Sequence, residues 1–259
     1  MKKIFIIISL SLFSCTDEFV PDNPLDPDNP DYIPPIVAII SGPEEGSTVN
    51  VSEVTFTYEG NEETMLYRTK FNSDMWSAWN NQSSTTYDYL DEGQHGFSVQ
   101  AKYTTGDTSD VAGVSFTVNA VSGPALIFYP RRHVAALGEV IQFQILAEEI
   151  VDLTAAEFTF DYNQNALDFI SITQGSIFQE SGESFFFTEE DNGSITINTA
   201  LWNNEEPSVT GTHDIAIIEM QVLQTVESEL TFDGTETFRD ALNNSINISA
   251  TVNGLVTSQ

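Results

Sequence analysis

The stretch Ala155-Ala156-Glu157-Phe158-Thr159-Phe160-Asp161-Tyr162 decides the fold of the second half of this chain. Small or aromatic side chains alternate with polar ones along it. Because successive side chains of a β-strand point to opposite faces, Ala156, Phe158, Phe160 and Tyr162 are predicted to line a core, while Glu157, Thr159 and Asp161 face solvent. The pattern predicts one strand of a half-solvated antiparallel sheet.

Two other stretches repeat this alternation. In residues 194–201, Ile195, Ile197 and Leu201 are predicted to face inward. In residues 229–233, Leu230 and Phe232 face inward. The three stretches together predict a polar face that could bind a partner. A face of this kind is also typical of any half-solvated sheet, so both interpretations stay open. Its outward residues are Glu157, Thr159, Asp161, Thr196, Asn198 and Thr231.

Short alternating runs broken by turn residues continue through the rest of the chain, and no stretch keeps a 3.6-residue period. The chain is therefore predicted to be all-β, with two β-sandwich domains. Between residues 125 and 257 the runs predict a nine-stranded jelly-roll sandwich. The expected strands are Leu126–Tyr129, Val140–Ala147, Ala155–Tyr162, Leu167–Gln174, Ser184–Thr188, Ser194–Leu201, Asp214–Val222, Glu229–Phe232 and Ile246–Val256.

The order of motifs in this region resembles the cohesin domain. The motifs are Gly138–Phe143, Leu153–Leu167, Gln174–Phe178, Ile215–Val222 and Asn253–Val256. The resemblance implies a non-catalytic module whose partner is a dockerin-like module, often carried by proteins that degrade glycans. It also implies that the polar face matches the strands on which cohesins bind dockerins.

The chain departs from the cohesin pattern at three places near that face. Asn163-Gln164 replaces the usual Asp-Pro, Ala155 stands where well-studied cohesins have an asparagine that grips dockerin, and Glu157 stands where they have an aspartate. Glu157 is therefore the best candidate for a charge-assisted hydrogen bond to a partner's Lys or Arg.

Residues 36–119 predict a smaller sandwich. This segment resembles bacterial immunoglobulin-like and fibronectin type III modules, through Trp76-Ser77-Ala78-Trp79 and Leu90–Ala101. The resemblance implies a spacer. Residues 120–124 predict a short hinge. The expected strands are Ile36–Ser41, Val54–Tyr58, Met65–Phe71, Thr86–Leu90, Gly96–Tyr103 and Val114–Val118.

Residues 1–14 predict a secretory signal peptide, with Lys2-Lys3 before an apolar run that is too short to span a bilayer. Leu12-Phe13-Ser14-Cys15 resembles the bacterial lipobox. The resemblance implies cleavage before Cys15 and acylation of this residue, the only cysteine in the chain. The mature protein is then expected in the cell envelope, anchored by lipid to the outer membrane or cell surface. An ordinary signal peptide is the alternative.

Residues 15–35 hold the acylated cysteine and a tether rich in proline and aspartate. Because prolines fix φ and remove backbone donors, the tether is predicted to be extended and semi-rigid. Calcium binding by Asp26, Asp28 and Asp31 stays an open alternative. An EF-hand is excluded, because Pro27 and Val37 occupy positions that its loop cannot accept.

The composition is strongly acidic, with 8 Lys+Arg against 39 Asp+Glu and a net charge of −31. Such a charge repels nucleic acid and anionic lipid headgroups. One cysteine allows no disulfide within a single chain. No nucleophile elbow or phosphate loop occurs, and His95, His133 and His213 lack metal-ligand spacing, so neither an enzyme nor a cofactor is predicted.

The last predictions concern the three tryptophans and one basic cluster. Trp202 is placed in a loop and is a candidate for stacking on sugar rings, so direct carbohydrate binding by the C-terminal sandwich is the alternative function. A structural envelope or adhesion protein is a third. Trp76 and Trp79 are predicted to pack within the first sandwich. Arg131-Arg132-His133 is predicted to be an exposed turn.

Overall fold

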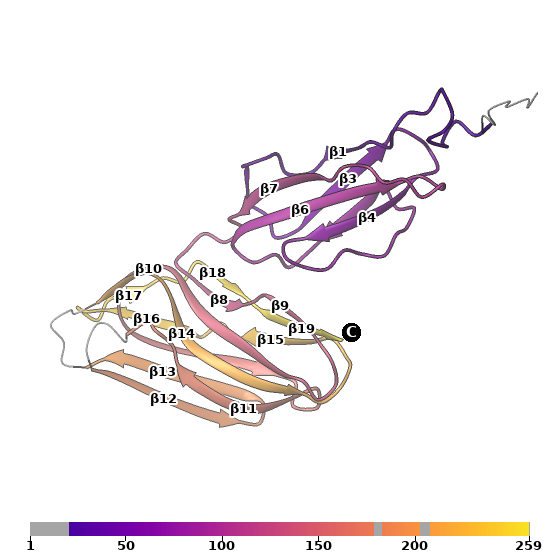
Figure 1. Ribbon diagram of the computed structural model, residues 1–259. Coiled ribbons are helices and arrows are strands. Elements are labelled where there is room, and N and C mark those ends of the chain that lie inside the picture. Colours follow the sequence, from indigo (N-terminus) through magenta and orange to yellow (C-terminus); the bar gives the residue numbers. More distant parts are fainter. Residues whose placement is uncertain (1–20, 179–182, 203–207, 259) are drawn as a thin grey trace, which may run out of the picture.

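The computed structural model describes residues 21–178, 183–202 and 208–258, and these form two β-sandwich domains (Figure 1). The all-β prediction is confirmed. Among the described residues, no helix has the length and apolar character that a membrane crossing requires.

The first domain is built from two facing sheets, with strand orders β1-β3-β5 and β2-β7-β6-β4. Its core is rich in aromatic rings because alternate residues of β3 and β6 point inward. Phe56 stacks on Phe97 with ring centroids 4.0 Å apart. The strands are β1 (Val37–Ser41), β2 (Thr48–Val49), β3 (Val54–Gly60), β4 (Leu66–Phe71), β5 (Ser84–Tyr87), β6 (Gly93–Lys102) and β7 (Ala112–Val118).

The predicted extended conformation of the tether is wrong for residues 23–32. Its backbone makes successive turns, in which the N–H groups of Asp26, Asn29 and Tyr32 each donate to a carbonyl three residues earlier. Asn and Asp side chains favour such turns by accepting N–H groups two residues ahead. The segment also packs on the first domain: the Tyr32 ring lies edge-on to Tyr103, 6.5 Å between centroids, and Tyr103 Oη donates to Ile33 O.

The second domain contains twelve strands where nine were predicted. Two predicted strands merge into the long β10, the predicted strand Ile246–Val256 is divided among β17, β18 and β19, and β9 and β16 are additional. The strands are β8 (Ala125–Tyr129), β9 (Arg132–Ala135), β10 (Val140–Tyr162), β11 (Leu167–Gln174), β12 (Ser184–Asp191), β13 (Ser194–Leu201), β14 (Val209–Val222), β15 (Ser228–Phe232), β16 (Thr237–Asp240), β17 (Ser245–Ile246), β18 (Ala250–Val252) and β19 (Gly254–Ser258).

β10 belongs to both layers of this sandwich. Its first part pairs with β14 and β8, and its last part pairs with β13, β15 and β16. The register shifts between the two parts, where Glu149 and Asp152 have positive φ, as expected of bulges that bend a strand. The layers meet through aromatic rings, with the Phe128 and Phe160 centroids 5.3 Å apart.

The two domains are joined by ion pairs rather than by a free hinge. Arg131 Nη2 lies 2.5 Å from Glu92 Oε1, and Arg132 Nη1 lies 2.6 Å from Asp88 Oδ1. The backbone N–H of Arg131 donates to Asp91 Oδ1 at 2.7 Å. We call these five residues the junction. Since Arg131 is only 4% exposed and Arg132 begins β9, the predicted exposed turn at Arg131-Arg132-His133 is wrong.

The segment predicted as a hinge is also held in place. The Glu92 carboxylate accepts the N–H groups of Ala120 and Val121, each at 3.1 Å. Gly123 N donates to Glu149 Oε2, and Ser249 Oγ donates to Ser122 O. The segment therefore has contacts in both domains along its length.

Candidate functional site

The structure brings all six predicted partner-binding residues onto one sheet face, across three neighbouring strands. Thr159 of β10 lies opposite Thr196 of β13, with the two hydroxyl oxygens 2.9 Å apart. Glu157 lies opposite Asn198. On the other side of β10, Asp161 lies opposite Thr231 of β15. We call these six residues the polar face.

The inward residues of the same strands fill the core, as the alternation predicts. Phe158, Phe160, Ile195, Ile197 and Leu230 are fully buried, whereas Glu157, Asp161 and Thr231 are exposed. The burial of these side chains therefore fixes the register in which the polar face points outward.

The polar face carries negative charge that the domain does not neutralise. Residues 125–258 contain only three Lys or Arg side chains. Arg131 and Arg132 are engaged at the junction. Arg239 of β16 lies opposite Ala155 at the border of the face, where its Nη1 donates to Ser245 Oγ at 2.8 Å. The face is therefore suited to a partner that brings its own cations.

Exposed aromatic side chains border the polar face, and the sequence reasoning missed two of them. Phe185 and Phe187 of β12 are 47% and 51% exposed, and Phe187 lies opposite Asn198. Trp202, 67% exposed, continues the ladder beyond β13, because its N–H donates to Glu183 O at 2.6 Å. This pairing places Trp202 on the same side of the sheet as the two phenylalanines. We call the three residues the aromatic row.

The predicted packing of Trp76 and Trp79 within the first sandwich is wrong. Both are only partly buried and lie against the outward side chains of β4 and β6. Arg68 stands over both rings, with its guanidinium carbon 4.8 Å and 4.7 Å from the centroids, and Lys102 Nζ is 4.6 Å from the Trp79 centroid. These tryptophan faces are therefore covered by the domain's own cations.

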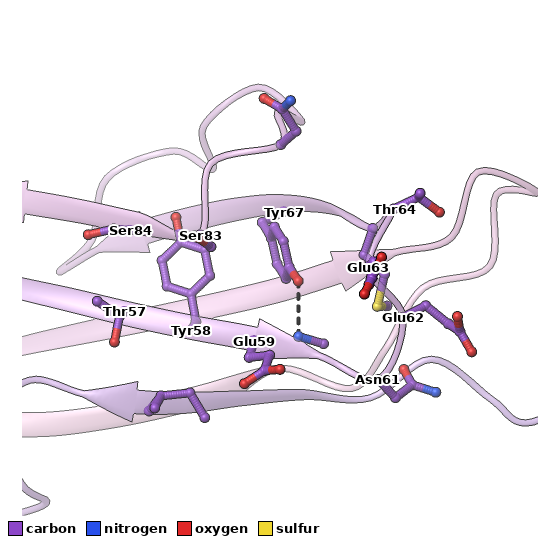
Figure 2. Close-up of a pocket in the computed structure, with 14 residues that line it drawn as sticks. Thr57, Tyr58, Glu59, Asn61, Glu62, Glu63, Thr64, Tyr67, Ser83 and Ser84 are labelled. Atoms are coloured by element: carbon purple, nitrogen blue, oxygen red, sulfur yellow. Dashed lines mark hydrogen bonds between the residues drawn. The ribbon is translucent and has the colours of Figure 1, made fainter.

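A hollow of about 810 Å³ on the first domain lacks the features of a site. Tyr58, Tyr67, Glu59, Glu62 and Glu63 are among the residues that line it (Figure 2). Burial raises the pKa of Tyr58 to about 12, and the Tyr67 hydroxyl accepts the N–H of Gly60 at 2.9 Å. Both rings belong to the core, so the hollow offers no aromatic face for a sugar.

The remaining predicted residues add no site. In the described part of the chain, no three His, Cys, Asp or Glu side chains gather as metal ligands would. His95 is held within the first domain, where its ring nitrogens contact Asp91 O at 2.9 Å and Asn72 Nδ2 at 3.1 Å. Cys15 lies outside the described residues.

The family model of the cohesin domain matches residues 130–257. This part of the chain is a cohesin domain, a family of non-catalytic protein-binding modules. No curated protein sequence matches the chain significantly.

Solved structures of cohesins are similar to this chain. A non-cellulosomal cohesin from the archaeon Archaeoglobus fulgidus is 20% identical, with a TM-score of 0.44, covering 52% of this chain and 90% of its own. The sixth cohesin of Acetivibrio cellulolyticus scaffoldin B, solved with a Cel5 dockerin mutant, is 19% identical, with a TM-score of 0.46 and coverage of 53% and 100%. A type I cohesin–dockerin complex from Clostridium thermocellum, Coh-OlpA-Doc918, is 17% identical, with a TM-score of 0.44, and the match covers 52% of this chain and 98% of that chain.

Proposed function

We propose that the cohesin domain binds a dockerin-type module of another protein through the polar face. The observation that supports this proposal is the adjacency of six outward polar residues on the strands that resemble the dockerin-contacting strands of cohesins. Glu157 and Asp161 are exposed carboxylates in a domain with few cations, so they are suited to charge-assisted hydrogen bonds from Lys or Arg.

Binding to purified dockerin-type modules of the source organism tests this function. Glu157→Ala with Asp161→Ala should weaken binding by about 2 kcal/mol or more. The melting temperature should stay nearly unchanged, because neither side chain is buried. Asp168→Ala, which removes an exposed carboxylate on β11, is the matched control and should leave binding unchanged. Failure of every module to bind the wild type would refute the proposal.

We further propose that Cys15 carries a lipid and that the chain works at the cell surface, in polysaccharide degradation or surface assembly. Lys2-Lys3, the apolar run and Ser14-Cys15 support the anchor, and Asp17-Glu18 resembles export signals of some surface lipoproteins. Two or three acyl chains bind a bilayer far more firmly than one.

Cell fractionation and mass spectrometry test the anchor. Cys15→Ala should move the protein from the membrane fraction to the soluble fraction. Protease added to intact cells should remove the wild-type domains. An unmodified Cys15 thiol in the mature protein would contradict the proposal, and full protection from protease would place the domains in the periplasm.

Direct glycan binding is a second candidate function, and the aromatic row favours it. Trp202, Phe185 and Phe187 are exposed on one side of β12 and β13. Flat aromatic faces are suited to the apolar face of a sugar ring. In native gels that contain polysaccharide, the wild type should be slowed, and Trp202→Ala should restore its mobility. A wild type that migrates equally with and without polysaccharide would exclude this function.

A further inference from the structure

We propose that β12 is an open sheet edge that accepts an added strand, supplied by an extended segment of a partner protein with cations followed by apolar residues. Among the described residues, β12 pairs only with β13. Figure 1 shows β12 at the border of the second domain, beyond β13. An edge strand presents unpaired N–H and C=O groups to solvent, and these can pair with another chain.

The alternation of hydrogen-bonded pairs between β12 and β13 identifies which backbone groups of β12 point away from β13. β12 and β13 are joined by the two-residue turn Asn192-Gly193, whose φ values of 52° and 86° are those of a tight hairpin. In such a hairpin the residues flanking the turn exchange hydrogen bonds, and every second pair follows. The hydrogen bond from Trp202 N to Glu183 O fits the same alternation at the end of the hairpin away from the turn. The outward-pointing backbone groups are therefore those of Phe186, Thr188 and Glu190, which we call the open edge.

The side chains beside the open edge specify the chemistry of the added strand. Phe185 and Phe187 are about half exposed on the outer face, and Glu189 and Asp191 continue the same face. Residues directly opposite each other in a sheet interact, and unlike charges are favoured there. An added strand should therefore place apolar residues beside the phenylalanines and Lys or Arg beside the carboxylates.

The charges of the domain favour such a partner over a second copy of the chain. Glu189, Glu190 and Asp191 follow one another at one end of β12, and no Lys or Arg lies on β12 or β13. Two acidic copies would repel each other, and like charges in opposite positions destabilise a sheet. A cationic segment meets attraction at the same place.

An antiparallel partner strand has a defined order of residues. Antiparallel pairing is the commoner kind and extends the β10-β13-β12 pattern. The peptide Lys-Thr-Lys-Thr-Val-Thr-Val would then place its lysines opposite Asp191 and Glu189 and its valines opposite Phe187 and Phe185. In the same antiparallel orientation, the reversed sequence has the same composition and charge but places valine against carboxylate.

Peptide binding to the full chain tests the proposal without any dockerin. The forward peptide should bind about tenfold more tightly than the reversed peptide in fluorescence anisotropy at physiological salt. It should also slow amide exchange at Phe186, Thr188 and Glu190. Thr188→Pro removes one outward N–H without touching the β13 ladder, so it should abolish binding while the melting temperature changes little.

A second control does not depend on the folding of Thr188→Pro. It is the forward peptide with methyl groups on the backbone nitrogens that face β12. It keeps every side chain and should not bind. Equal binding of the forward and reversed peptides would overturn the proposal, as would binding of the methylated peptide or of Thr188→Pro. The proposal is also separable from dockerin recognition, because Glu157→Ala with Asp161→Ala should leave peptide affinity unchanged.

Discussion

Two outer sheet faces differ in what surrounds their aromatic rings. One is the face of β4 and β6 in the first domain, and the other is the face of β12 and β13 in the second domain. Trp76 and Trp79 are covered by Arg68 and Lys102 of their own domain. The aromatic row of the second domain has no cation on its strands and is bordered by carboxylates instead. The first face is therefore internally satisfied, whereas the second presents apolar and acidic groups to a partner.

The two domains also differ in where their cations lie. The six Lys and Arg side chains of the described residues are few, and five of them lie in the first domain or at the junction: Arg68, Lys70, Lys102, Arg131 and Arg132. Only Arg239 lies near the polar face. The uneven placement of cations leaves the second domain acidic on the side where partners are proposed to bind.

The largest expected effect tests the register that defines the second face. Phe160→Ala should lower the free energy of unfolding by about 3–5 kcal/mol, because Phe160 is fully buried between the layers. Thr159→Ala, on the outer face, should cost under about 1 kcal/mol, although it loses the contact with Thr196. Urea unfolding of both variants measures the difference. Equal losses would mean that the two faces are exchanged.

The next effect concerns the junction between the two regions. Arg131→Met should destabilise the protein by about 2–3 kcal/mol, because it leaves Glu92 partly buried without its cation. Arg132→Met removes a more exposed pair and should cost under about 1 kcal/mol. Limited proteolysis near residues 120–124 should become faster in Arg131→Met only. Unchanged cleavage would show that the backbone contacts hold the domains without the ion pair.

A direct test of the comparison replaces one tryptophan on each face. Trp79→Ala should destabilise the first domain by about 1–2 kcal/mol, because the faces offered to Arg68 and Lys102 are lost. Trp202→Ala should leave thermal unfolding nearly unchanged, since its side chain is mostly exposed. Scanning calorimetry compares the two variants. A large loss in Trp202→Ala would give Trp202 a structural role and remove it from the aromatic row.

Much of the fold could be predicted from the sequence where alternation is regular. The predicted strands Leu167–Gln174 and Ser194–Leu201 have the bounds of β11 and β13. That Val140–Ala147 and Ala155–Tyr162 form one continuous strand could not be predicted, because residues 148–152 interrupt the alternation and pass through bulges. β9 and β16 are short and each contains an arginine, so no apolar run marks them.

The candidate site was predictable only in part, for a physical reason that differs between its two portions. The polar face follows from strands in which aromatic and polar residues alternate. Phe185-Phe186-Phe187 has three equivalent residues in a row, so the sequence does not say which rings point outward. The position of β12 at a sheet edge, like the pairing of Arg131 with Glu92, depends on contacts between distant segments.

The smallest expected effect is the pH dependence of the junction. Burial raises the pKa of Asp91 above its ordinary value of 3.8, against the opposing effects of the hydrogen bond from the Arg131 N–H and of nearby cations. The folded state therefore binds this proton more readily than the unfolded state. The resulting stabilisation is fully present below pH 3.8 and is lost as the pH rises through the raised pKa. Asp91→Asn cannot titrate but can still accept the Arg131 N–H. Urea midpoints measured between about pH 4 and about pH 7 should therefore fall more with rising pH in the wild type than in Asp91→Asn. Parallel pH profiles would show that Asp91 ionises as readily in the folded junction as in the unfolded chain.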